Sequence, residues 1–348
     1  MASAPTDMTL QVVSANAATV TLREIDEDVP PLDDGSVYGL DWGTGYGQVY
    51  GRPIVDGDQV VRRLRVLEGP APVRGAEARM DRSAFPEDPA VAIDTLTGPA
   101  VTAEEVEYES RSGRFPAWYV TGQGDTWVIL VHGYRSTRAE VMRALTVTVE
   151  MGLPTLAITY RNDEGVPADR TDMYGFGATE WQDLEGAVQY ALDQDASDVV
   201  LLGNSMGGAV SASFMEKSPL SDRVSAMVLD SPMLDFGETV SHGASQRTLP
   251  VIGRVPESLV WTAKRLASVR YGVDWESIDY LDDTSWVTVP TLVVHGTEDL
   301  RVPIDLSEEL AAGEPELVRL ETFDGAEHVG AWNQDTQRYE ELLREFLG

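Results

Sequence analysis

The stretch Val199-Val200-Leu201-Leu202-Gly203-Asn204-Ser205-Met206-Gly207-Gly208 decides the fold class. An apolar, β-branched run leads into it, and a helical pattern over Ala209–Lys217 follows. The stretch therefore predicts a sharp strand-to-helix turn with Ser205 at its apex, inside the pattern Gly-x-Ser-x-Gly. Glycines two residues before and after the serine relieve crowding there. Such a turn would expose the Ser205 Oγ and aim the Met206 amide, at the helix N-terminus, toward a developing oxyanion.

Strand and helix patterns alternate on both sides of this turn. A hairpin is expected over Glu105–Glu109 and Phe115–Val120. The strands expected after it are 127–131, 155–160, 199–202, 226–229, 291–294 and 317–322, and the helices are 138–151, 180–193, 206–217, 305–312 and 333–346. Continuous apolar strands alternating with amphipathic helices are typical of a mostly parallel sheet covered on both faces. In such sheets the functional site lies at the carboxyl ends of the strands.

The first hundred residues have a different pattern. Short β runs separated by turn residues extend from Thr9 to Leu67, and the Pro- and Asp-rich stretch Gly69–Ala100 is interpreted as a linker. The Gly-rich segment Gly39–Gly47 is assigned to a β-turn, because no buried strand leads into it and no helix follows, as a phosphate loop requires. We therefore expect a β-rich region with a linker over 1–103 and an α/β domain over 104–348. The β strands could extend the sheet, form a separate lobe or make a dimer contact.

About fifty residues interrupt the alternation between Asp235 and Trp286. They contain a helical pattern over Ser258–Tyr271. An insertion at this place, above the expected site, is interpreted as a cap over 235–286. Its tryptophans Trp261 and Trp275 could line an acyl pocket, but packing within the core of the cap is the favoured expectation.

The composition is that of a folded protein with an unusual charge. Of 348 residues, 43% are hydrophobic, and 58 acidic against 26 basic residues give a formal net charge of -32. So negative a surface repels phosphate backbones, which argues against nucleic acid as a partner. No run of apolar residues approaches the roughly 20 needed to span a bilayer. The first ten residues lack the pattern of a signal peptide, so a cytoplasmic location is predicted.

Metal and thiol chemistry have little support in this sequence. It contains no cysteine, which excludes disulfides, thiol nucleophiles and thiolate ligands. Its four histidines show neither His-x-x-His nor His-Glu-x-x-His spacing. No cofactor and no metal ion are therefore expected.

A serine nucleophile needs a base, and the base needs a carboxylate that orients it. His328 is placed to be the base, because it lies in a loop between the last strand and the last helix, after the serine and the acid in chain order. Asp299 is the favoured acid, since it follows the strand 291–294 in a Gly-x-x-Asp loop. Glu298, its neighbour, and Asp230, one strand earlier, stay open as alternatives.

The other histidines and the second oxyanion donor come from the same strand ends. His132 and His295 each precede a glycine where a buried strand meets its loop, and structural roles are predicted for both. The amide of Tyr134 is the expected partner of the Met206 amide, because Gly133 lets the chain turn tightly enough to present it. Arg135 and Arg161 are the candidate arginines for offsetting negative charge beside a pocket.

Four motifs, taken together and in order, resemble a known family. They are His-Gly-Tyr at 132–134, Gly-Asn-Ser-Met-Gly-Gly at 203–208, His-Gly-Thr-Glu-Asp-Leu-Arg-Val-Pro at 295–303 and Gly-Ala-Glu-His at 325–328. The chain resembles the α/β-hydrolase superfamily, especially its serine-aminopeptidase-like and esterase-like members, over Glu104–Gly348. The resemblance implies a catalytic triad of Ser205, Asp299 and His328, with the amides of Tyr134 and Met206 as oxyanion hole. The region before Glu104 resembles no module that we can name.

These residues predict a carboxylic ester hydrolase that works through an acyl-enzyme intermediate on a small-molecule ester. A serine at the turn argues against dehalogenase and epoxide-hydrolase chemistry, which needs a carboxylate there. An acyltransferase, a thioesterase or a small-peptide or amide hydrolase would use the same residues. A catalytically silent binding protein of the same fold is the alternative from another class. The sequence leaves the natural substrate and the oligomeric state open.

Overall fold

The computed structural model describes residues 8–25, 32–86, 88, 101, 103–168, 173–249 and 253–348. The chain divides into two compact units. The first contains Met1–Ala103, Arg135–Met151 and Trp332–Gly348, and the second contains Glu104–Tyr134 and Gly152–Ala331. Each unit therefore combines segments that lie far apart in the sequence.

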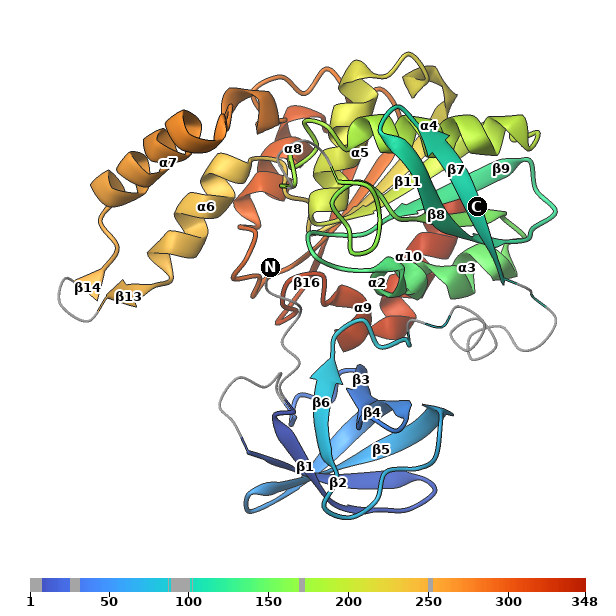
Figure 1. Cartoon of the computed structure of the whole chain (residues 1–348), viewed down its shortest axis with the longest axis vertical. Coiled ribbons are helices and arrows are strands. Elements are labelled where there is room, and N and C mark those ends of the chain that lie inside the picture. The colour runs from blue at the N-terminus through green and yellow to red at the C-terminus, as the bar shows by residue number, and fades with distance from the viewer. Residues whose placement is uncertain are drawn as a thin grey trace. The chain divides into compact units, whose positions relative to one another are not determined.

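The second unit is built on an eight-stranded sheet with the order β16-β15-β12-β11-β9-β10-β8-β7 (Figure 1). Its strands are β7 (Ala103–Ser110), β8 (Gly113–Val120), β9 (Thr126–Val131), β10 (Thr155–Ile158), β11 (Asp198–Asn204), β12 (Val224–Asp230), β15 (Thr291–Gly296) and β16 (Val318–Phe323). Within this sheet, neighbouring strands pair in parallel from β16 through β15, β12, β11 and β9 to β10. Strand β8 pairs antiparallel with β10. The expected mostly parallel sheet is confirmed.

The central strands are buried on both faces, as their continuous apolar sequences require. Every residue of β10 and of β15 is buried. Helices α4 (Trp181–Asp193), α5 (Met206–Lys217) and α8 (Asp305–Gly313) belong to the same unit. Residues 206–215 of α5 are all buried, which is typical of a helix enclosed in a core rather than one lying on a surface. The nucleophile turn therefore leads from a buried strand into a buried helix.

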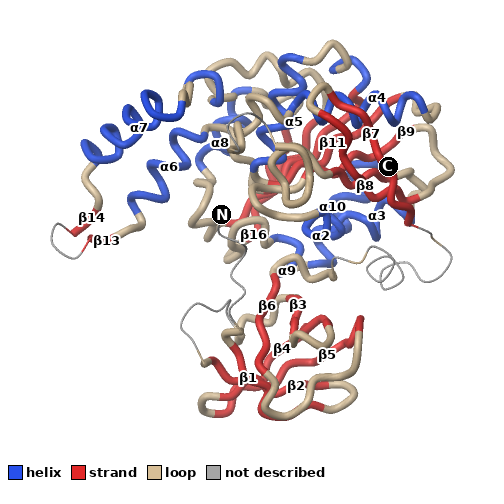
Figure 2. The backbone as a smooth tube through the Cα atoms, viewed as in Figure 1, coloured by secondary structure: helices blue, strands red, loops and turns tan. Residues whose placement is uncertain are grey.

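The N-terminal strands form a closed antiparallel barrel with the order β1-β2-β5-β4-β3-β6 (Figure 2). The strands are β1 (Leu10–Ala15), β2 (Thr19–Glu24), β3 (Tyr38–Asp41), β4 (Tyr46–Asp56), β5 (Gln59–Glu68) and β6 (Glu77–Asp81). The predicted turn in Gly39–Gly47 is confirmed, because β3 and β4 form a hairpin around it. The linker interpretation of Gly69–Ala100 is wrong at β6, which closes the barrel by pairing with both β1 and β3.

The barrel has its own apolar core, supplied by alternate residues of its strands. Leu10, Val12, Val20 and Leu22 are fully buried, while their neighbours in the strands are less so. This period of two is the pattern of a strand with one buried face. Arg62 is also buried, and its guanidinium donates to the backbone carbonyls of Leu32 and Ser36, which satisfies donors that burial would otherwise leave costly.

The helices of the first unit are shorter than the sequence patterns predict. The helix expected over 138–151 is divided into α2 (Arg138–Val141), the 3-10 turn η1 (Met142–Ala144) and α3 (Leu145–Glu150). The helix expected over 333–346 is divided into α9 (Ala331–Gln334) and α10 (Thr336–Leu347). Asp335 lies between these two helices. It caps the N-terminus of α10, because its side chain accepts from the backbone N–H of Arg338 at 3.1 Å.

Asn333, a residue of α9, connects this C-terminal segment to the barrel within the first unit by hydrogen bonds. Its Nδ2 donates to the carbonyls of Val37 at 2.6 Å and Arg82 at 3.0 Å. Beside it, the ring of Trp332 contacts that of Phe85 at a centroid distance of 5.4 Å. Across the described ranges, no helix is long and apolar enough to cross a membrane.

The predicted insertion consists of two helices joined by a small hairpin (Figure 1). Its elements are α6 (Phe236–Ser245), β13 (Thr248–Leu249), β14 (Gly253–Arg254), α7 (Glu257–Tyr271) and the 3-10 turn η3 (Glu276–Ile278). No residue of α7 is buried. The prediction that Trp261 packs inside the cap is wrong, since this side chain is 64% exposed. Trp275, in contrast, is half-buried.

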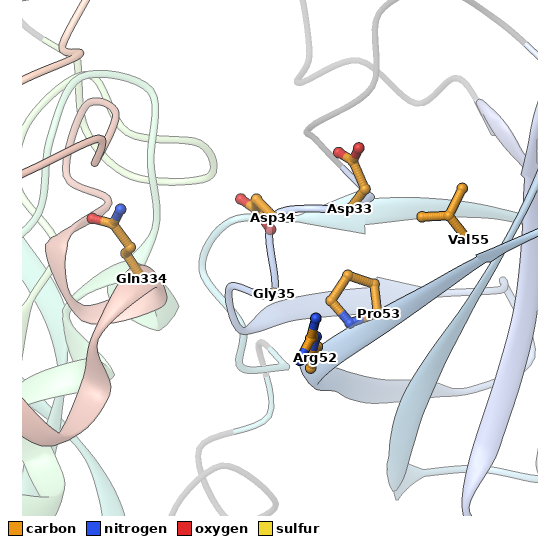
Figure 3. Close-up of a pocket in the computed structure, with 7 residues that line it drawn as sticks. All are labelled: Asp33, Asp34, Gly35, Arg52, Pro53, Val55 and Gln334. Carbon is orange, nitrogen blue, oxygen red and sulfur yellow. The ribbon is translucent and has the colours of Figure 1, made fainter.

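A hollow of about 510 Å³ lies in the first unit. Figure 3 shows Asp33 and Asp34 on the loop before β3, and Arg52 and Pro53 from β4, with Gln334 of α9 opposite them. None of these residues belongs to the predicted site. The site residues all lie in the second unit.

Candidate active site

Ser205 occupies the turn between β11 and α5, and its backbone is strained. Its φ of 51° and ψ of -114° lie in a region that residues with a side chain rarely adopt. A Cβ on Gly203 would lie 2.5 Å from the carbonyl oxygen of Gly207, and one on Gly207 would lie 2.1 Å from that of Val131. The two glycines of Gly-x-Ser-x-Gly are therefore required by close backbone approach.

His328 lies beside this serine, although 123 positions separate the two in the sequence. Its Nε2 is 2.9 Å from the Ser205 Oγ, and its Nδ1 is 2.7 Å from the Asp299 Oδ2. A carboxylate oxygen can only accept, so Nδ1 carries the proton and donates it. The Nε2 lone pair is then left to accept the hydrogen of the serine hydroxyl. This tautomer is the one a general base requires.

Asp299 is held by donors on both of its oxygens. The Oδ1 accepts from the backbone N–H groups of Arg301 at 2.8 Å and Val302 at 2.9 Å. Burial on its own would raise the pKa of this carboxyl, but hydrogen bonds from His295 and His328 outweigh burial and hold the pKa well below its usual range. Of the two alternatives, Glu298 is exposed, and Asp230 ends β12, where its carbonyl accepts from the Ser205 N–H at 2.9 Å.

His295 contacts the same carboxylate from the other side. Its Nε2 is 3.2 Å from the Asp299 Oδ2 and 3.2 Å from the carbonyl oxygen of Val302. Its Nδ1 is 2.7 Å from the Ser307 Oγ, which can donate to it. The sequence predicts a structural histidine here but does not indicate this contact, because nothing in a His-Gly pair says which way the ring faces.

His132 belongs to a second histidine–aspartate pair at the end of β9. Its Nε2 is 2.9 Å from the Asp163 Oδ2, and its Nδ1 is 2.9 Å from the carbonyl oxygen of Gly133. The ring also stacks on Tyr160 at a centroid distance of 4.5 Å, and the Tyr160 hydroxyl donates to the His132 carbonyl at 2.8 Å. Its Nδ1 also lies 3.4 Å from the Tyr160 hydroxyl, so the ring is enclosed by Asp163, Gly133 and Tyr160.

The two amides predicted as oxyanion donors come from the loop after β9 and from the start of α5. Met206 is the first residue of α5, where helix amides have no acceptor inside the helix. For Tyr134, the preceding carbonyl of Gly133 points at the His132 ring. In a trans peptide the N–H points away from the carbonyl, so the Tyr134 N–H is directed away from that ring.

Unusual backbone angles gather in the loops around Ser205. Ser231 and Val329 have φ values of 47° and 50°, and the Ser231 Oγ accepts from the Val329 N–H at 3.1 Å. These residues follow β12 and His328, respectively. Strain of this kind persists only where the surrounding structure over-determines it, and it clusters at functional sites. The region around Ser205, Ser231 and Val329 is therefore the candidate active site.

Comparison with known proteins identifies the family of this chain. Residues 128–344 match the family described as the alpha/beta hydrolase family, which is more than half of the chain. The chain belongs to the alpha/beta hydrolase family. It is also similar to the uncharacterized protein Rv2307c of Mycobacterium tuberculosis, with 28% identity over 253 residues that cover 70% of this chain and 78% of that protein.

Solved structures resemble this alpha/beta hydrolase in fold. The esterase Pf2001 of Pyrococcus furiosus has a TM-score of 0.57 and 21% identity, over 73% of this chain and 94% of that one. The alpha/beta hydrolase GrgF of Penicillium sp. sh18 has a TM-score of 0.53 and 17% identity, over 71% of this chain and 98% of that one. Family and fold together support a hydrolase.

One charged residue of this alpha/beta hydrolase does not have the role suggested from its sequence. Arg161 is buried, and its guanidinium forms a two-point ion pair with Asp183, with distances of 2.7 and 2.9 Å. It is thus engaged in the interior and does not offset charge at a pocket. Among the described residues, no group of three or more His, Asp or Glu is arranged to hold a metal ion.

Proposed function

We propose that this alpha/beta hydrolase cleaves carboxylic esters through an acyl-enzyme intermediate. Ser205 is the nucleophile, His328 the general base and Asp299 the carboxylate that orients the imidazole. The backbone N–H groups of Met206 and Tyr134 are the oxyanion donors. A small-molecule ester is the proposed substrate class.

The observation that carries the proposal is the hydrogen-bonded chain from the Ser205 Oγ to the His328 Nε2 and from the His328 Nδ1 to the Asp299 Oδ2, at 2.9 and 2.7 Å. Both distances lie within the range at which a base can take a proton. The depressed pKa of Asp299 keeps this group an anion at neutral pH, so it can stabilise the imidazolium that forms.

The reaction then follows from these positions. Ser205 Oγ attacks the carbonyl carbon while its proton passes to the His328 Nε2. The carbonyl oxygen becomes an oxyanion that accepts from the two amides, and one such donor is worth about 100- to 1000-fold in rate. The imidazolium protonates the alcohol as the ester bond breaks. A water molecule then attacks the acyl carbon while His328 takes its proton, the bond from that carbon to the Ser205 Oγ breaks, and the imidazolium returns the proton to Oγ as the acid leaves.

The test is turnover of p-nitrophenyl esters with two to sixteen acyl carbons by the wild type and by Ser205→Ala. We expect the wild type to cleave part of the series and the variant to lose about 10⁶-fold in kcat. Ser211→Ala is a matched control, because Ser211 is a buried serine of the same helix that bonds only to the backbone carbonyl of Gly207 at 2.9 Å in the described contacts. This control should keep its activity.

A serine-directed phosphonate separates the remaining outcomes. Labelling of Ser205 without cleavage of any ester would retain the nucleophile but overturn the ester substrate. Failure of both cleavage and labelling would favour a silent binding protein. Formation of new esters when acceptor alcohols are added would instead identify acyl transfer as the reaction.

A further inference from the structure

Four aromatic side chains form a continuous row that we call the aromatic ladder: Tyr134, Phe176, Phe236 and Trp275. The ring centroids of Tyr134 and Phe176 are 5.6 Å apart, with an angle of 34° between the rings. Phe176 stacks on Phe236 at 3.6 Å and 16°. Phe236 in turn stacks on Trp275 at 5.6 Å and 14°. The ladder therefore runs from the residue proposed as oxyanion donor to the cap.

The segments that carry the ladder pack directly on the nucleophile turn. Beside Phe176, a Cβ on Gly177 would lie 2.8 Å from the carbonyl oxygen of Ala209, which is one helical turn beyond Ser205. Three residues before Phe236, the Met233 N–H donates to the Ser205 carbonyl at 3.1 Å. The ladder thus lies at the carboxyl edge of the sheet, where α/β folds bind their ligands.

Phe176 is held in an unfavourable backbone conformation. Its φ is 52°, which is uncommon for a bulky residue. The buried carboxylate of Glu180 accepts from the N–H of Gly175 at 2.6 Å and of Gly177 at 3.0 Å, on either side of the phenylalanine. The Tyr280 hydroxyl donates to the Phe176 carbonyl at 3.3 Å. Backbone strain that several hydrogen bonds maintain indicates a functional position rather than packing alone.

Trp275, at the far end, is also fixed. Its Nε1 donates to the Ser268 Oγ at 3.0 Å, and the Lys264 ammonium lies 5.6 Å from its ring centroid. Tyr134, at the near end, also meets the edge of the Tyr174 ring at a centroid distance of 5.1 Å, but it differs from the other three rings of the ladder because it is 45% exposed. A row of rings that served only to fill a core would be buried at both ends.

We infer that the aromatic ladder is one wall of a substrate subsite and selects esters with a planar aromatic group. The inference rests on the proposed function and names the class of ester that Ser205 attacks. The physical reason is that a substrate ring can stack on the exposed part of Tyr134, whereas a saturated ring of the same size cannot. One aromatic pair changes binding by about 2- to 10-fold beyond what the buried area contributes.

Matched esters test this directly on the wild-type protein. Ethyl phenylacetate against ethyl cyclohexylacetate varies the acyl group, and benzyl acetate against cyclohexylmethyl acetate varies the alcohol. We expect kcat/KM for the aromatic ester to exceed that for its saturated partner by about 3- to 10-fold in one pair, which also identifies the side of the ester that meets the ladder. Equal values in both pairs would overturn the inference while leaving the esterase proposal intact. Cleavage of neither pair would instead count against the esterase proposal.

Variants of Tyr134 test the ladder residue itself, because side-chain changes leave its amide in place. Tyr134→Leu should abolish the preference for the aromatic ester, and Tyr134→Phe, which keeps the ring, should retain it. Trp261→Leu is the matched control, since Trp261 is an exposed tryptophan of the cap outside the ladder. A preference that survives Tyr134→Leu, or that is lost equally in Trp261→Leu, would contradict the assignment.

Boronic acids give a readout that needs no variant. The Ser205 Oγ adds to boron, with its proton passing to His328, so these compounds inhibit without turnover. Benzylboronic acid should inhibit about 3- to 10-fold more strongly than cyclohexylmethylboronic acid if the acyl side meets the ladder. Equal inhibition, together with equal kcat/KM values for the alcohol pair, would leave the ladder without a role in binding.

Discussion

Two buried histidine–aspartate pairs follow strands of the same sheet, and their hydrogen bonds differ in one respect. In the pair His328–Asp299, one ring nitrogen faces the carboxylate and the other faces the Ser205 hydroxyl. In the pair His132–Asp163, one nitrogen faces the carboxylate and the other faces the Gly133 carbonyl. The difference is therefore in the third partner, which is the serine hydroxyl in one pair and a backbone carbonyl at 2.9 Å in the other, with the Tyr160 hydroxyl farther away at 3.4 Å.

This difference separates a histidine that can act as a general base, His328, from one that holds the backbone in place, His132, which we call the anchor. A ring that donates to a carboxylate and faces a hydroxyl keeps a lone pair for the hydroxyl proton. The His132 ring, enclosed by Asp163, the Gly133 carbonyl and Tyr160, meets no serine hydroxyl in the described contacts, but it can hold a peptide group in one orientation. We therefore propose that His328 acts on the proton of Ser205, while His132 positions the peptide that presents the Tyr134 amide.

The largest effect is expected at His328. Replacing it by Gln should lower kcat by about 10⁶-fold, because the serine then has no base. Thermal unfolding should change little, because the Gln amide can still donate to the Asp299 carboxylate in place of the imidazole. Steady-state kinetics with a p-nitrophenyl ester measures the loss. A variant that keeps more than about one-hundredth of the activity would remove His328 from the mechanism.

The two aspartates provide the next comparison. Asp299→Asn should lower kcat by about 10⁴-fold, because an amide in this place favours the wrong tautomer of His328. Asp163→Asn should have a much smaller effect on kcat, since His132 transfers no proton. Single-turnover rates of the two variants at pH 7 make the comparison, and equal losses would show that the two pairs do not differ in role.

His132 should affect stability more than chemistry. We expect His132→Phe to lower the free energy of unfolding by about 1 to 3 kcal/mol, because it removes one of three donors to the Asp163 carboxylate and leaves those of Tyr160 and Tyr174. Its kcat should fall by no more than about 10²- to 10³-fold, the value of one oxyanion donor. Urea unfolding and ester kinetics on the same preparation test both numbers. A catalytic loss as large as that of His328→Gln would contradict the assignment as an anchor.

The smallest effect concerns pH. The pKa of Asp299 is lower in the folded protein than in the unfolded chain, so the folded state binds fewer protons and this stabilisation is lost as pH falls below about 4. From pH 7 to pH 3 the loss is about 1 kcal/mol. The difference in unfolding free energy between the wild type and Asp299→Asn should shrink by this amount, as urea titrations at the two pH values would measure. A constant difference would mean that Asp299 has an ordinary pKa.

Local patterns predicted the parts of the site that depend on neighbours in the chain. The turn at Ser205 was predictable because an apolar strand, two glycines and a buried helix are consecutive. The positions of His328 and Asp299 were predictable from the order of loops after strands. Strand β6 was not, because its five residues resemble a linker until they pair with β1 and β3.

Side-chain partners were less predictable than positions. Asp163 is 31 residues from His132, and nothing near it in the sequence marks it as that ring's partner. The aromatic ladder likewise joins Phe176 to Phe236 across sixty positions. Trp261 and Trp275 belong to the same insertion, yet one is exposed and the other stacks on Phe236. Such contacts depend on how separate segments fold back on one another.

The sequence by itself determined the strand-to-helix turn, the alternation that builds a parallel sheet, and the small set of side chains that can meet at its carboxyl edge. These follow from hydrophobic periodicity and from the steric freedom of glycine, which act over a few residues. The tertiary structure alone decided the partners of the other two histidines, which are Asp163 and the Gly133 carbonyl for His132 and the Asp299 carboxylate for His295. That choice depends on hydrogen-bond distances of about 3 Å between residues far apart in the chain, which only the packed fold can set.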